Sequence, residues 1–107
     1  MSNLEYHVLL ALAARPLYGY AIKDAIVSES AGTLAPLAGS LYRVLSRLMS
    51  SGLVREAEPD AELPPHPGHA RRYYGLTARG RKALGVEARR LKGAAAVAEK
   101  RLAEGRS

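Results

Sequence analysis

A length of 107 residues allows one domain with a modest core, and 16 Lys and Arg against 10 Asp and Glu favour a polyanionic partner. The absence of cysteine excludes disulfides, thiolate zinc sites and cysteine nucleophiles. No apolar run is long enough for a membrane span and no signal-peptide pattern is present, so we expect a cytoplasmic protein.

The first two predicted helices are short and largely apolar. Ser2 or Asn3 can cap a helix over about residues 4–14, which we expect to be mostly buried. Residues 15–19 interrupt this pattern, since proline disfavours a helical residue before it and glycine opens the turn. A second helix is predicted over about residues 20–29.

The third predicted helix, over about residues 40–50, has the clearest amphipathic pattern. Ser40 can cap its start, and Gly52 can end it. Its polar face carries Tyr42, Arg43, Arg47 and small hydroxyls without any acid, which suits a groove lined by phosphates but also an ordinary solvated face. The second and third predicted helices, joined by a short connection and with the basic face on the later one, predict a helix-turn-helix. The apolar face has helical spacing and consists of Leu41, Val44, Leu45, Leu48 and Met49.

Beyond this helix the sequence predicts a wing, namely two short strands at about residues 53–57 and 71–77. The intervening segment contains four prolines, so we expect a loop. The returning strand begins with Arg71 and Arg72, which make it basic. The outgoing limb carries four acids, Glu56, Glu58, Asp60 and Glu62. We expect them to pair with these cations or to face solvent.

Thr77 can cap a last helix over about residues 78–104. A helix of this length rises roughly 40 Å, more than a small core can cover, so we expect a second copy of the chain to bury its apolar seam. Leu4 and Val8 of the first helix are expected to contribute to this interface. The alternative is a tail helix that packs on its own domain. The seam has heptad-like spacing and consists of Leu84, Ala88, Leu91, Ala95, Ala98 and Leu102.

Several stretches together resemble the PadR family of bacterial transcription regulators. They are Leu17-Tyr18-Gly19-Tyr20-Ala21-Ile22, Gly39-Ser40-Leu41-Tyr42, Gly52-Leu53-Val54 and Arg71-Arg72-Tyr73-Tyr74-Gly75-Leu76-Thr77-Ala78-Arg79-Gly80. The resemblance implies a winged helix-turn-helix that dimerises through its terminal helices and represses promoters. It also implies that a small molecule releases DNA in some members. The single helix after the wing is similar to the short subfamily. Ala38 and Arg43 stand where the family commonly has proline, so its base preference is not carried over.

The predicted fold class is therefore mainly α (α+β), with a DNA-binding domain at residues 1–77 and a dimerisation helix at residues 78–107. Ser40, Tyr42 and Arg43 are expected to contact bases and nearby phosphates, because the first turn of the third helix enters the major groove. Tyr20 and Tyr74 are assigned mainly to the core. The remaining predicted DNA contacts are to phosphate and come from Lys23, Arg47, Arg71 and Arg72.

Other functional classes have weaker support. The chain lacks a phosphate loop, an activated nucleophile and a metal framework, so we expect no enzyme, no cofactor and no metal site. His66 and His69 have a ligand-like spacing but lie in the proline-rich loop. His7 is interpreted as a packed histidine or part of the dimer contact.

Two alternatives to double-stranded DNA binding stay open. A winged helix can serve as a protein-interaction module, although the acid-free third helix and the basic wing disfavour that role. Single-stranded nucleic acid would need exposed aromatics, for which Tyr42 and Tyr73 are the candidates. If an effector exists, a cavity between the first helix and the partner's last helix, near Tyr6 and His7, would admit an apolar or phenolic compound.

Overall fold

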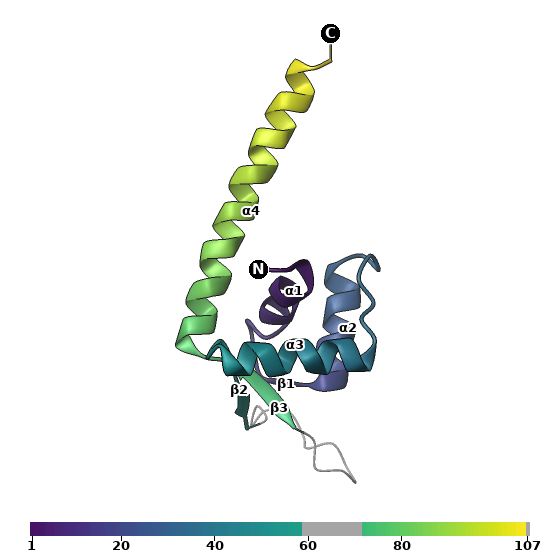
Figure 1. Cartoon of the computed structure of the whole chain (residues 1–107). Helices are drawn as coiled ribbons and strands as arrows, with labels where there is room; N and C mark the ends of the chain where they lie inside the picture. The colour runs from purple at the N-terminus through teal and green to yellow at the C-terminus, as the bar shows by residue number, and fades with distance from the viewer. Residues whose placement is uncertain (59–71, 107) are drawn as a thin grey trace.

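The computed structural model describes residues 1–58 and 72–106 and contains four helices and a small sheet in this part of the chain (Figure 1). The elements, in chain order, are α1 (Asn3–Ala11), β1 (Leu17–Tyr18), α2 (Gly19–Glu29), α3 (Ala38–Ser50), β2 (Val54–Ala57), β3 (Tyr73–Leu76) and α4 (Ala78–Glu104). The arrangement is that of a winged helix-turn-helix followed by a long helix, so the predicted fold class is confirmed.

The sheet has three antiparallel strands in the order β1-β3-β2. β2 and β3 form the base of the wing, with Val54 opposite Leu76. The third strand, β1, was not predicted, because two residues are too short to show an alternating pattern. It pairs Leu17 with Tyr74 and so fixes the start of α2 beside the wing.

The core lies where α1, α2 and α3 converge on the inner face of the sheet. Leu9, Ile22 and Leu45 are almost completely buried and come from three different helices. Val8 is also fully buried in its own domain, so it has no surface to offer a partner chain and its predicted role in dimerisation is corrected. Tyr74 is 2% exposed, which confirms its assignment to the core.

The start of α1 and the end of α3 have the capping residues predicted from the sequence, whereas the start of α3 does not. Ser2 and Glu5 form a capping box at α1, which ends at Ala11, earlier than predicted. Gly52, at φ 75°, ends α3 as predicted, and its amide and that of the next residue donate back to the last turn of the helix. Ser40 is not the N-cap, because α3 begins two residues earlier at Ala38 and Ser40 lies in its first turn.

The long helix α4 begins at the wing and extends away from the rest of the domain (Figure 1). The radius of gyration is 16.1 Å, against about 13 Å for a compact chain of about 100 residues, because this helix projects outward. Leu84 packs against the domain's own core, whereas Leu91 and Leu102 are exposed. Only the first part of the predicted seam is therefore covered within one chain. Among the described residues, no helix is long and apolar enough to cross a membrane.

Candidate nucleic-acid interface

The exposed face of α3 is polar, cationic and free of acids. Tyr42, Arg43 and Arg47 all lie on its solvent side, while the opposite side of the helix is buried. The Arg43 guanidinium lies 3.4 Å from the Ser40 hydroxyl, so two of the three side chains predicted to contact bases lie together in the first turns of the helix. Local periodicity was sufficient to place these residues on one surface.

Arg47 lies in the last turn of α3, one turn beyond Arg43. Its charge contributes to lowering the pKa of the Glu5 carboxyl, although the largest causes are hydrogen bonds from the Ser2 backbone and side chain. This position at the edge of the α3 face suits a contact to phosphate more than a contact to a base.

Tyr42 is held in place by the start of α2. A Cβ atom on Gly19 would come within 2.5 Å of the Tyr42 hydroxyl oxygen and 3.1 Å of ring carbon Cζ, so the ring lies directly against the glycine backbone. About half of the Tyr42 side chain is still exposed. The glycine therefore permits an aromatic side chain to be packed on one side and open to a ligand on the other.

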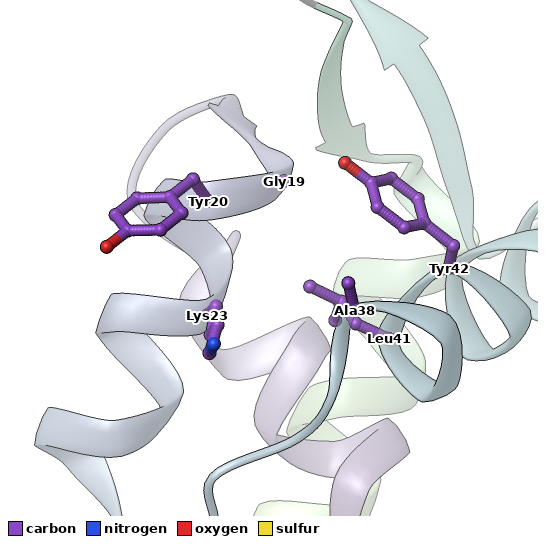
Figure 2. A pocket seen from close by; sticks show the side chains of 6 residues that line it. All are labelled: Gly19, Tyr20, Lys23, Ala38, Leu41 and Tyr42. Atoms are coloured by element: carbon purple, nitrogen blue, oxygen red, sulfur yellow. The ribbon is translucent and has the colours of Figure 1, made fainter.

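A pocket of about 230 Å³ lies between the first turns of α2 and α3 (Figure 2). Figure 2 shows Lys23 and Ala38 facing each other across it, and Tyr42 reaching toward Gly19. Tyr20 also lines the pocket and is 62% exposed, so its assignment to the core was wrong. The error arose because Tyr20 stands next to the apolar residues Ala21 and Ile22, whereas the first turn of α2 directs its side chain outward.

The base of the wing carries a further cation. Arg72 precedes β3, is largely exposed, and forms a 2.8 Å ion pair with Glu56 of β2. This confirms the predicted pairing of the two limbs for one of the acids. Other predicted residues of the wing lie outside the described part of the chain, namely Arg71, Asp60, Glu62, His66 and His69.

The pKa of Tyr74 in β3 responds to groups on both α3 and the wing. Burial raises the pKa of its phenol, and the nearby Tyr42 phenol raises it further. Arg72 acts in the opposite direction through its charge and a hydrogen bond. The Tyr42 phenol of α3 and the charged pair of the wing therefore both act on the pKa of Tyr74.

His7 is packed between helices rather than exposed for a ligand. Its Nδ1 atom lies 3.9 Å from a carboxylate oxygen of Glu29, whose pKa is raised by burial and lowered in part by this histidine. The described residues contain no group of three or more His, Cys, Asp or Glu side chains that could hold a metal ion.

A second cavity, of about 150 Å³, lies between α1 and the middle of α4. It is lined by Tyr6, Glu87, Arg90 and Leu91 together with the first three residues. Glu87 and Arg90 form a bidentate ion pair of 2.7 and 2.9 Å, which lowers the pKa of the Glu87 carboxyl. This cavity opens beside the uncovered part of α4.

Solved structures share this architecture. A PadR family transcription regulator from Clostridium difficile is 22% identical, with a TM-score of 0.76 over 94% of this chain and 99% of that chain. Bacillus subtilis PadR, solved in complex with operator DNA, is 21% identical, with a TM-score of 0.63 over 78% of this chain and 46% of that chain. At these identities the likeness establishes the fold.

Sequence comparison gives the family. A 37.1 kDa protein of transposon TN4556 from Streptomyces fradiae, itself uncharacterised, is 42% identical over 87 residues; the match covers 81% of this chain and 22% of that protein. The chain therefore spans only about a fifth of the length of this relative. The transcriptional regulator PadR-like family matches residues 8–86, which include α2, α3, the wing and the start of α4. The chain belongs to the PadR-like family of transcriptional regulators.

Proposed function

We propose that this protein is a sequence-specific, double-stranded DNA-binding repressor that acts as a homodimer and that a small molecule releases from DNA. The observation that carries the proposal is the exposed face of α3, where Tyr42 and Arg43 project without any acidic neighbour on the helix. A major groove lined by phosphates and base edges is the surface that matches this composition.

The elements around α3 support a division of roles. The first turn of α3, with Ser40, Tyr42 and Arg43, contacts base edges. Lys23, Arg47 and Arg72 contact phosphates and give affinity that depends on salt but carries little sequence information. The starts of α2 and α3 have no side-chain cap among the described residues, so their first-turn amides are available to phosphate oxygens. Bacillus subtilis PadR, which shares this fold, was solved in complex with operator DNA, and this supports DNA binding by the present chain.

Dimerisation is supported by the part of α4 that its own domain leaves uncovered. Every described residue from Arg89 onward is exposed, including Leu91 and Leu102. A single exposed helix of this kind is unlike the covered amphipathic helices of a globular domain. Packing against α4 of a second copy would bury the seam and create the two-fold symmetry that a palindromic operator requires. Leu4, half-buried on α1, can extend this interface.

Release by an effector is supported by the cavity between α1 and α4. Its volume of about 150 Å³ suits a small ligand, and Tyr6 and Leu91 offer an apolar surface beside the Arg90 guanidinium. A ligand there would contact the helix that we assign to dimerisation and could change the spacing between the two DNA-binding domains. A phenolic or other small apolar compound fits this chemistry.

The test is a fluorescence anisotropy titration of the purified protein against DNA from its own upstream region, at two salt concentrations and with random DNA as the control. We expect specific binding with two chains per site and an affinity that falls steeply with salt. Equal, salt-insensitive affinity for both DNAs, together with salt-insensitive capture of a protein partner, would instead identify a protein-interaction module.

A further inference from the structure

The pocket between α2 and α3 differs in chemistry from the surface around it. Ser40 and Arg43 lie on the same first turns of α3 and are suited to phosphates and base edges. The residues that line the pocket, in contrast, are mostly apolar or aromatic, and Lys23 is the only charged residue among them; the others are Gly19, Tyr20, Ala38, Leu41 and Tyr42. An apolar recess on a polar DNA-binding surface requires an apolar partner, since water is poorly held by such walls.

The major groove offers one apolar group on its base edges, which is the C5-methyl group of thymine. The volume of about 230 Å³ admits this methyl group together with the adjoining edge of the base. Because Ala38 lies at the first position of α3, the pocket opens beside the turn that enters the groove. Lys23 at the wall can contact a phosphate of the same strand while the methyl group is enclosed.

We propose that this pocket recognises a thymine methyl group in each half-site of the operator. The proposal rests on the proposed DNA-binding function and adds a specificity determinant made by apolar contact rather than by hydrogen bonds. Ala38 is central to it, because a larger side chain at that position would fill the recess.

The test begins with selection of binding sites from a random duplex pool. Each thymine of the selected site is then replaced singly by deoxyuridine, which removes only the methyl group and leaves every hydrogen-bonding group unchanged. Dissociation constants are measured by anisotropy at fixed salt. We expect one thymine per half-site at which the loss is about fourfold, the equivalent of the ~0.8 kcal/mol gained on burying one methyl group. Other thymines should change the affinity less than twofold.

The protein variant Ala38→Met places a flexible apolar side chain in the pocket, and Ala38 is exposed, so the fold is preserved. In this variant the uracil-containing and thymine-containing sites should bind with about equal dissociation constants, so their ratio should fall to about one. Ala35→Met is the matched control, since Ala35 is exposed in the connection before α3 and does not line the pocket, and it should keep the fourfold ratio.

The outcomes separate the two proposals. Selective DNA binding without a methyl effect at any position, or a ratio that survives in Ala38→Met, overturns methyl recognition and leaves the DNA-binding function standing. A pool that yields no enriched sequence overturns the DNA-binding function and methyl recognition with it.

Discussion

The Thr77 hydroxyl donates a 2.6 Å hydrogen bond to the carbonyl oxygen of Gly52, which lies 25 residues earlier at the end of α3. The same hydroxyl accepts a 3.0 Å hydrogen bond from the Gly80 amide and so caps α4. The Thr77 amide also donates to the Leu53 carbonyl oxygen. One threonine thus joins the end of the predicted recognition helix to the start of the predicted dimerisation helix.

Replacing this threonine should destabilise the fold. Thr77→Val keeps the shape but removes the cap and the interhelical hydrogen bond, so we expect the free energy of unfolding to fall by about 2 kcal/mol. Thr77→Ser, which retains the hydroxyl, should recover most of the loss. Urea denaturation followed by circular dichroism measures both variants, and equal stability of Val and Ser variants would contradict this role of the hydroxyl.

Only glycine fits at position 80, for a steric reason. A Cβ atom on Gly80 would clash with the Leu53 carbonyl oxygen, so Gly80→Ala should lower the free energy of unfolding, although alanine favours an isolated helix by about 1 kcal/mol. Gly93→Ala is the matched control, since no atom lies within 4 Å of the added Cβ. Urea denaturation should show a loss for the first variant and no loss for the second.

The ion pair at the base of the wing should restrain DNA binding. Glu56→Gln releases Arg72 to contact phosphate, so we expect tighter DNA binding and a salt dependence steeper by about one released counterion. Stability should change by less than about 0.5 kcal/mol, because both side chains are exposed. Glu58→Gln removes the same charge two residues later and serves as the control. Identical affinity gains in the two variants would show a general charge effect rather than release of Arg72.

Arg43 should contribute to sequence discrimination more than to general affinity. Arg43→Ala removes a guanidinium from the first turns of α3, and a side chain that contacts base edges contributes about 1–3 kcal/mol of discrimination. We therefore expect at least a fivefold greater loss on the selected site than on random DNA. Lys23→Ala should weaken binding to both DNAs alike. Parallel anisotropy titrations measure, for each variant, the loss of affinity on the selected site and on random DNA. Equal losses on the two DNAs for Arg43→Ala would refute a contact to bases.

The capping box of α1 predicts a pH dependence of stability. Hydrogen bonds from Ser2 lower the pKa of Glu5 below its ordinary 4.5, so the folded state prefers the ionised carboxylate. Its stabilisation is complete above about pH 4.5 and is lost as the pH falls through the lower folded pKa. Glu5→Gln should therefore flatten the dependence of unfolding free energy on pH between neutral and acidic solution. Urea titrations at several pH values test this, and an unchanged slope would contradict it.

The face of α4 used for dimerisation can be tested by two substitutions to the same acid. Leu91 belongs to the predicted seam, whereas Val86 is exposed on the opposite side of the helix. Leu91→Glu should shift the protein toward the monomer in analytical ultracentrifugation, because it places a charge in the buried seam. Val86→Glu should leave the mass unchanged, and the reverse result would assign the interface to the other face.

The sequence alone was sufficient for features that depend on neighbouring residues. The spacing of apolar positions located the four helices, Thr77 and Gly52 marked two helix ends, and the length of α4 predicted that part of it would project. These features follow from local hydrogen bonds and helical periodicity, which any chain with this pattern shares.

Tertiary structure decided what depends on distant segments. β1 exists because it pairs with β3, and that pairing places the start of α2 against Tyr42. Tyr20 is exposed and Tyr74 is buried, although both are tyrosines within apolar stretches, because the first turn of α2 directs the Tyr20 ring outward whereas β3 places the Tyr74 ring in the core. The pocket between α2 and α3 likewise arises from two first turns that are remote in sequence. Its lining could not be predicted, since no local pattern specifies which side chains two helices bring together.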